Sequence, residues 1–285
     1  MPIEHGSLES VCWGYGLIEG PRVDAVGDLY FSDVPNGGVY RRSTDGEVSV
    51  AIPKRRGIGG MVFHADGGLV VGGRNIQHVR NGEVRVVLDS LPDRKGFNDL
   101  HTDEQGRIYV GTFGTGPFEV LDGAEPVDGE CLRIDAEGSH TVLYGGITIT
   151  NGIGFSPARD VLYHADTGRQ QVVAHTVAAD GSMTDRRAFH EGSSFFPDGL
   201  AVADDGSVWV ADYEGGAVRV FDRDGVEIGI VDVPTSACTS VCFGGDDRRD
   251  LYIVTADNTE VPSRAGTVFR TRVDVAGVPT PLATV

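Results

Sequence analysis

Short apolar strands recur along the chain in pairs that are joined by tight polar turns. The second strand of each pair holds three apolar or aromatic residues, with one histidine among them, at 29–31, 69–71, 108–110, 162–164, 208–210 and 251–253. Successive pairs lie 39 to 54 residues apart, and no helical pattern separates them. A repeat of this length built only from strands and turns is typical of a β-propeller with one repeat per blade. The pattern predicts an all-β, six-bladed β-propeller.

A second set of regularly spaced positions lies before the return strands. Eleven or twelve residues before the centre of each return strand, one residue begins the first strand of its repeat. In a propeller that strand is innermost, so these residues should lie at one depth around the central axis. The six blades are expected to start near Glu19, Gly59, Asn98, Asn151, Asp198 and Ser240.

The repeats account for nearly all of residues 1–285, so we expect a single domain. The last repeat is one strand short, because only a tail broken by proline and glycine follows Gly266–Thr271. Residues Ser7–Cys12 are predicted to supply the missing outer strand and to close the ring without an open sheet edge.

The inner positions predict a metal site. Glu19, Asn98, Asn151 and Asp198 would bring two carboxylates and two amides together, and buried polar groups without partners cost about 1–3 kcal/mol each. A divalent cation resolves this conflict, and an oxygen-only donor set suits Ca²⁺, Mg²⁺ or Mn²⁺ better than a structural zinc. The small residues Gly59 and Ser240 are expected to leave free volume beside the ion, as in a catalytic centre.

Composition narrows the partners. The net charge is −18, from 42 acidic and 24 basic residues, which disfavours nucleic acid and anionic membranes. No apolar run approaches the roughly 20 residues of a membrane helix, and the N-terminus lacks the features of a secretory signal. We therefore expect a soluble, cytoplasmic protein with no evident protein partner. The four cysteines are interpreted as buried thiols rather than as disulfides.

Four motifs carry a resemblance to a known family. In order and spacing, Glu19-Gly20-Pro21, Asn98-Asp99, 151–155 (NGIGF) and 197–201 (PDGLA) resemble the gluconolactonase and senescence-marker-protein (regucalcin-like) family. The resemblance implies a six-bladed propeller with one divalent metal ion in its channel and lactonase activity on sugar lactones. Carried over by position, it implies Glu19, Asn151 and Asp198 as metal ligands.

The same resemblance implies further roles. Asp198 would also be the general base, and Asn98 would be a fourth ligand or a contact to substrate and water, with Asp99 beside it. Sugar-lactone members commonly have an arginine two residues before this asparagine, whereas this chain has Gly96. Lys95 or Arg74 could replace that arginine, so the predicted substrate-binding residues are Asn98, Asp99 and Arg74.

The predicted function is metal-dependent hydrolysis of a small lactone, a sugar lactone in the first place. Three alternatives stay open: a phosphotriesterase-like activity, a lyase activity at the same metal, and a propeller that binds calcium or a ligand without turnover. The metal stays open among Ca²⁺, Mg²⁺, Mn²⁺ and Zn²⁺. No Gly-x-Ser-x-Gly motif occurs, so nothing in the sequence favours a serine hydrolase.

Overall fold

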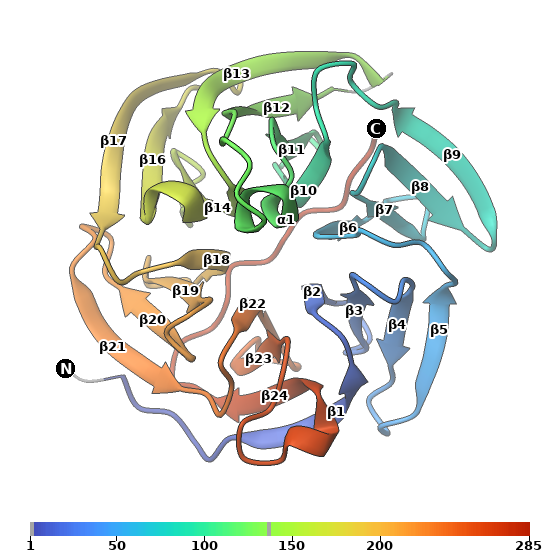
Figure 1. Ribbon diagram of the computed structural model, residues 1–285, viewed down its shortest axis with the longest axis vertical. Coiled ribbons are helices and arrows are strands. Elements are labelled where there is room, and N and C mark those ends of the chain that lie inside the picture. The colour runs from blue at the N-terminus through green and yellow to red at the C-terminus, as the bar shows by residue number, and fades with distance from the viewer. Residues whose placement is uncertain (1–2, 136–137) are drawn as a thin grey trace.

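Six sheets stand around a common axis. The computed structural model describes residues 3–135 and 138–285, and within them 24 strands form six four-stranded antiparallel sheets (Figure 1). The prediction of a six-bladed β-propeller is confirmed. Within the described residues no helix is long and apolar enough to cross a membrane.

Each of the first five sheets uses four consecutive strands, with the innermost strand first in sequence. Their bounds are β2 (Ile18–Val23), β3 (Leu29–Asp33), β4 (Val39–Arg42) and β5 (Val48–Ile52); β6 (Met61–Phe63), β7 (Leu69–Val71), β8 (Ile76–Arg80) and β9 (Glu83–Leu88); β10 (Gly96–Thr102), β11 (Ile108–Phe113), β12 (Gly129–Ile134) and β13 (His140–Ile147); β14 (Thr150–Phe155), β15 (Val161–Asp166), β16 (Gln171–Val177) and β17 (Met183–Glu191); β18 (Pro197–Val202), β19 (Val208–Asp212), β20 (Ala217–Phe221) and β21 (Glu227–Asp232).

The N-terminus closes the ring. The sixth sheet has the order β1-β24-β23-β22, with β1 (Glu9–Tyr15), β22 (Cys238–Gly244), β23 (Asp250–Thr255) and β24 (Gly266–Arg272). Cys12 pairs with Val268 in this sheet, and Glu9 pairs with Arg270. The predicted closure by the N-terminal segment is confirmed, although the strand runs to Tyr15 rather than ending at Cys12.

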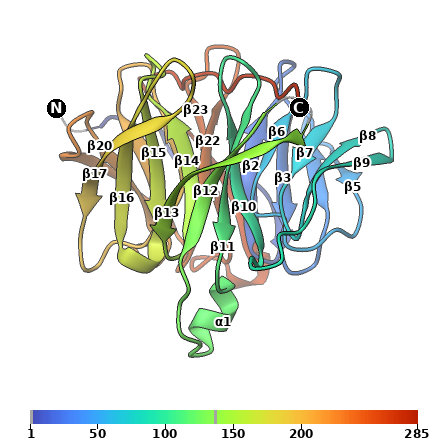
Figure 2. The same ribbon diagram turned by 90° about the horizontal axis from the view of Figure 1, so that it is seen from above.

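The C-terminal tail crosses one face of the propeller instead of lying loose (Figure 1). Its backbone bridges Ala203 of the fifth blade through Gly277 and His64 of the second blade through Ala283. The short helix α1 (Pro117–Leu121) projects from the opposite face (Figure 2). Among the described residues, η2 (Thr167–Arg169) and η3 (Pro262–Arg264) are short 3₁₀ turns.

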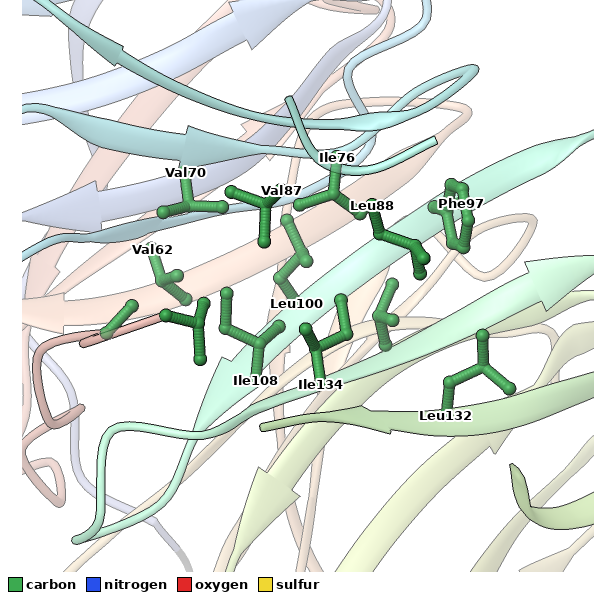
Figure 3. Close-up of a cluster of buried hydrophobic side chains, with 13 residues drawn as sticks. Val62, Val70, Ile76, Val87, Leu88, Phe97, Leu100, Ile108, Leu132 and Ile134 are labelled. Atoms are coloured by element: carbon green, nitrogen blue, oxygen red, sulfur yellow. The ribbon is translucent and has the colours of Figure 1, made fainter. Parts of the chain in front are cut away.

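Apolar clusters fill the spaces between blades. In the cluster of Figure 3, Val62 and Ile76 of the second blade lie with Leu100 and Ile108 of the third, and Ala283 of the tail joins them. Burying one such side chain contributes about 1.5–3 kcal/mol, so neighbouring blades hold each other in place. All four cysteines are free and buried, as predicted.

Candidate metal centre

The inner strands interrupt their pairing at the predicted site. The register breaks between Glu19 and Arg22 in β2, between Phe97 and Leu100 in β10, between Thr150 and Ile153 in β14 and between Pro197 and Leu200 in β18. A bulge re-aims the side chains that it releases from the ladder. Glu19 lies at the edge of the register break in its strand, and Asn98, Asn151 and Asp198 lie inside the breaks in theirs. The same kind of bulge therefore recurs in four blades.

Glycines let these strands approach one another. A Cβ atom on Gly152 would lie 2.4 Å from the backbone nitrogen of Leu200, and one on Gly199 would lie 1.9 Å from Oγ of Ser240. Both contacts are far inside van der Waals distance. The glycine after Asn151 and the glycine after Asp198 are therefore required for the inner strands to meet.

The space beside Gly59 is not free. A Cβ atom there would lie 1.6 Å from Oδ1 of Asn98, so the Asn98 amide occupies the volume that the glycine leaves. Ser240 is also in contact, because its hydroxyl faces Gly199. The expectation that both small residues open volume beside an ion is wrong for Gly59, whose role is to accommodate Asn98.

Two amides link the third and fourth blades. Nδ2 of Asn98 donates to Oδ1 of Asn151 at 2.5 Å and to the carbonyl oxygen of Thr150 at 2.7 Å. Nδ2 of Asn151 donates to Oγ1 of Thr167, which donates to the carbonyl oxygen of Pro197. This chain of hydrogen bonds ends beside Asp198 and fixes how both amides are oriented.

Behind these amides lies a buried histidine. His164, fully buried in β15, has its Nε2 2.7 Å from Oγ1 of Thr150 and its Nδ1 2.9 Å from the Tyr144 hydroxyl. Burial, followed by the charge of neighbouring groups, lowers the pKa of His164 to about 3. His164 is thus a neutral core residue that supports Thr150.

Three buried carboxyl groups lie near one another at the candidate site, with too little positive charge nearby to balance them if all three were ionised. Glu19, Asp99 and Asp198 are all less than 8% exposed. Burial first, and then the charges of Asp198 and Asp99, raise the pKa of Glu19 well above its usual range. Burial and the charge of Asp99 do the same to the pKa of Asp198. The Arg22 guanidinium opposes this effect at Asp99, whose pKa burial nevertheless raises to about 6.

These residues fit a hard divalent cation. Oδ1 of Asp198 and Oδ1 of Asp99 are buried and have no hydrogen-bond partner among the described residues. A cation would supply the missing partner and would favour the ionised carboxylates. The structure shows no group of three His, Cys, Asp or Glu side chains arranged for a metal within residues 3–135 and 138–285. Independently of this, two carboxylates and two amides offer oxygen donors, which fit oxygen-preferring ions better than zinc.

Tyr213 is a site neighbour that the predicted residue set lacks. It follows β19, and burial together with the charges of Asp198 and Glu19 raises its pKa. Its phenol is therefore near enough to be influenced by these carboxyl groups and stays protonated at neutral pH. A polar residue just after the second strand of the Asp198 blade was the only signal for it in the sequence.

The backbone of Arg74 lies beside Gly96, the position at which the family arginine is expected. Its Cα is 3.7 Å from the point where a Cβ of Gly96 would stand, two residues before Asn98. The side chain is exposed, and no hydrogen bond or ion pair engages it among the described residues. Lys95, the other candidate, forms a salt bridge with Glu119 of α1 at 3.0 Å and is thus already paired.

Known proteins are similar to this chain over nearly its whole length. The chain is 31% identical over 270 residues to a pentonolactonase of Haloferax volcanii, covering 88% of each chain. It is 33% identical over 273 residues to a 6-deoxy-6-sulfogluconolactonase of Pseudomonas putida, covering 89% of this chain and 90% of the relative. Among solved structures, the calcium-binding protein regucalcin of Agrobacterium tumefaciens has the same fold, with a TM-score of 0.84, 22% identity and coverage of 100% and 99%.

The family assignment rests on most of the chain. A profile of the SMP-30/gluconolactonase/LRE-like region matches residues 17–257, from the first inner strand to the end of the sixth blade's second strand. All four bulged inner positions fall within that match. The chain therefore belongs to the SMP-30/gluconolactonase/LRE-like family.

Proposed function

We propose that the chain is a lactonase that opens sugar lactones at one divalent metal ion held by Glu19, Asn98, Asn151 and Asp198. The observation that carries this proposal is the buried, unpartnered Oδ1 of Asp198 beside the equally buried carboxyl of Glu19. The relatives named pentonolactonase and sulfogluconolactonase, which match nearly the whole chain, support sugar lactones as the substrate class. A calcium-binding relative of the same fold supports a metal of the alkaline-earth kind.

The proposed chemistry divides between the ion and the side chains. A divalent cation in this site supplies Lewis acidity to a lactone carbonyl. The Asp198 carboxylate takes a proton from the attacking water as its oxygen bonds to the acyl carbon. When the ring C–O bond breaks, Asp198 returns that proton to the departing alkoxide, which yields the open hydroxy acid. Asn98 and Asn151, held by their hydrogen bonds, keep the reacting groups in position.

Substrate turnover with controlled metal tests this function. Protein treated with EDTA should lose hydrolysis of aldonolactones, and Ca²⁺, Mg²⁺, Mn²⁺ or Zn²⁺ added singly should restore it. The product mass should exceed the lactone mass by one water. A product without added water would indicate the lyase alternative. Hydrolysis of phosphotriesters but not of lactones would indicate the phosphotriesterase-like alternative. Metal binding without turnover of lactones or phosphotriesters would indicate a propeller that binds calcium or a ligand without catalysis.

Arg74 is expected to contribute to substrate recognition. We expect Arg74→Ala to raise KM for aldonolactones about tenfold while metal content stays the same, because the variant loses one charged hydrogen bond to substrate. Arg80→Ala, an exposed arginine at the end of β8 in the same blade, is the matched control. Steady-state kinetics and metal analysis check this. If Arg74→Ala changed neither KM, nor kcat, nor the order of preferred lactones, Arg74 would be a surface residue without a role in substrate recognition.

Restoring the family arginine at Gly96 is a poor test of the same idea. Gly96 has φ +151°, and a Cβ atom would lie 2.9 Å from the carbonyl oxygen of Gly73. An arginine there would be strained before it reached any substrate. Loss of stability in Gly96→Arg would therefore say nothing about specificity, which is why Arg74 is the better position to change.

Acidification should weaken metal binding. The buried carboxyls of Glu19 and Asp198 have raised pKa values without a cation, so protons compete with the ion for the same oxygens. In the metal-free protein, a carboxyl with a raised folded pKa stabilises the fold at low pH and loses that contribution as pH rises through the folded value. The gain in Tm on adding Ca²⁺ should thus be larger at about pH 7.5 than at about pH 5. A gain that does not change with pH would contradict these ligands.

A further inference from the structure

A cavity of about 710 Å³ lies at the opposite ends of the inner strands. Its walls come from the second halves of all six of these strands, whereas Glu19, Asn98, Asn151 and Asp198 are not among its lining residues. The volume falls within the roughly 300–1,000 Å³ usual for small-molecule sites. The cavity is therefore separate from the candidate metal centre, although both lie along the propeller axis.

Solvent reaches this cavity from the tail face. Exposed turns at Ala25–Val26 and Gly67–Gly68 line its outer end. Four residues of the C-terminal tail line the cavity: Val278, Pro279, Thr280 and Leu282. The tail itself crosses this face of the propeller (Figure 1). Small molecules can therefore enter beside the tail without passing the metal centre.

The cavity walls are mostly apolar. Val62, Phe155, Leu200, Val241 and Phe243 contribute hydrocarbon surface from four different blades. Cys242 adds a thiol that burial keeps neutral by raising its pKa to about 12. An apolar ligand body would be desolvated favourably against these walls.

Charged residues also line the cavity: Asp24, Asp246 and Arg248 beside the turns, and the half-buried Arg22 on an inner strand. Nη1 of Arg22 donates to the carbonyl oxygen of Pro21 at 2.8 Å, and Nη2 donates to that of Leu100 at 2.9 Å. Its Nε is buried and has no partner, and no carboxylate is hydrogen-bonded to Arg22 among the described residues. The Arg22 charge lowers the pKa of the buried Asp99 and Glu19 carboxyls, but no hydrogen bond joins Arg22 to either of them. Nη1 and Nη2 each keep a second N–H, so this cavity-lining guanidinium has capacity for an anionic partner.

His101 lies next to this cation and also lines the cavity. Its Nδ1 is engaged by the backbone of Thr102 at 2.9 Å, and its ring packs against Phe155 with centroids 5.5 Å apart. Burial first, and then the Arg22 charge, lowers the pKa of His101 to about 3, so the ring is neutral. Its Nε2 has no partner within residues 3–135 and 138–285 and is available to a ligand.

We propose that this cavity is a second binding site, which takes a small carboxylate with an apolar body. The carboxylate accepts hydrogen bonds from Arg22 with His101 beside it, and the apolar body lies along Phe155, Leu200 and Phe243. A guanidinium matches a carboxylate better than it matches any neutral group, because two of its N–H groups can be bound at once. The proposal is independent of turnover at the metal centre.

Octanoate and 1-octanol are suitable probes, because they share an eight-carbon chain and differ in charge. Binding can be followed by titration calorimetry and by fluorescence of Trp209, which is fully buried and lies 5.6 Å, centroid to centroid, from the cavity residue Phe243. Wild-type protein should bind octanoate saturably and more tightly than 1-octanol. Arg22→Leu should weaken octanoate at least about tenfold and leave 1-octanol unchanged.

A second variant leaves Arg22 in place. Ala201→Phe adds a ring where Ala201 lines the cavity and should remove the binding of both probes. Ala188→Phe, on the exposed face of the outer strand β17, is the matched control and should bind like the wild type. Thermal unfolding and metal analysis of each protein report separately on the fold and on the metal centre.

Two results would overturn the proposal. One is a wild-type protein that binds no octanoate at millimolar concentration, which would mean that the cavity holds only water. The other is octanoate affinity that is unchanged in both Arg22→Leu and Ala201→Phe, which would place the probe elsewhere. Lactone turnover plays no part in these measurements, so failure of the proposed lactonase function would leave both results interpretable.

Discussion

Asp198→Asn is expected to lower kcat/KM for sugar lactones by about 10³-fold or more. The change keeps the shape of the side chain but removes both the base and one charge facing the ion. Loss of a general base alone costs about 10²–10⁴-fold, and a weakened metal adds to that. Steady-state kinetics with saturating metal, together with metal analysis, check this expectation.

The same variant should not destabilise the metal-free protein. Without a cation, Asp198 and Glu19 are buried carboxyls that raise each other's cost of ionisation. An amide at position 198 removes that repulsion, so Tm in EDTA should stay the same or rise, while the stabilisation by added metal should shrink. Loss of activity with gain of stability is the pattern expected of a functional residue and not of a structural one.

Asp204→Asn is the matched control for this experiment. Asp204 is exposed and lies just past β18 in the same blade. Its change should leave kinetics, metal content and Tm at wild-type values. If Asp198→Asn retained full metal-dependent turnover, the assignment of the base and of this ligand would be wrong.

The propeller was predictable because each blade repeats one strand pattern. Leu29–Phe31 and Val208–Val210 both report the second strand of a blade, and counting back from such strands gave inner positions that the structure places in bulges of β2, β10, β14 and β18. Side-chain oxygens at Glu19 and Asp198 then pointed to one site. Repetition made this possible, since an error in one blade is corrected by the others.

The tail could not be predicted in the same way. Residues 273–285 contain proline and glycine and show neither strand nor helix periodicity. They are held mainly by backbone hydrogen bonds to other blades, as where the Val278 N–H donates to the Val202 carbonyl oxygen. Such contacts leave no pattern in the local sequence. Helix α1 is similarly short, at five residues, and was not predicted.

The details of the site also depend on distant packing. No local signal indicates that the Asn98 amide fills the space over Gly59. The cavity around Arg22 joins residues from all six blades, so it appears only once the ring is closed. Counting along the repeats identified the inner positions of the blades, whereas the orientation of each side chain comes from the bulges.

Closure of the ring yields the second large expected effect. Cys12→Asp should lower Tm by roughly 10 °C, because it places an unpaired charge inside the sixth blade at a cost of about 3–5 kcal/mol. Cys12 packs with Ile18 and Val268, and burial raises the pKa of its thiol to about 12. Differential scanning calorimetry of metal-loaded protein measures the change.

The neighbouring residue provides the control. Trp13 is 49% exposed and its ring lies 4.4 Å from the Arg264 guanidinium, so Trp13→Asp should shift Tm by only about 3 °C or less.

Removing residues 1–15 altogether exposes the edge of β24 and should cause aggregation. If Cys12→Asp and Trp13→Asp had equally small effects and the truncated protein kept its Tm, β1 would be a dispensable extension. The expected contrast instead makes the N-terminal strand the element that holds the first and last blades together, because β1 and the β2 residue Ile18 share one apolar cluster.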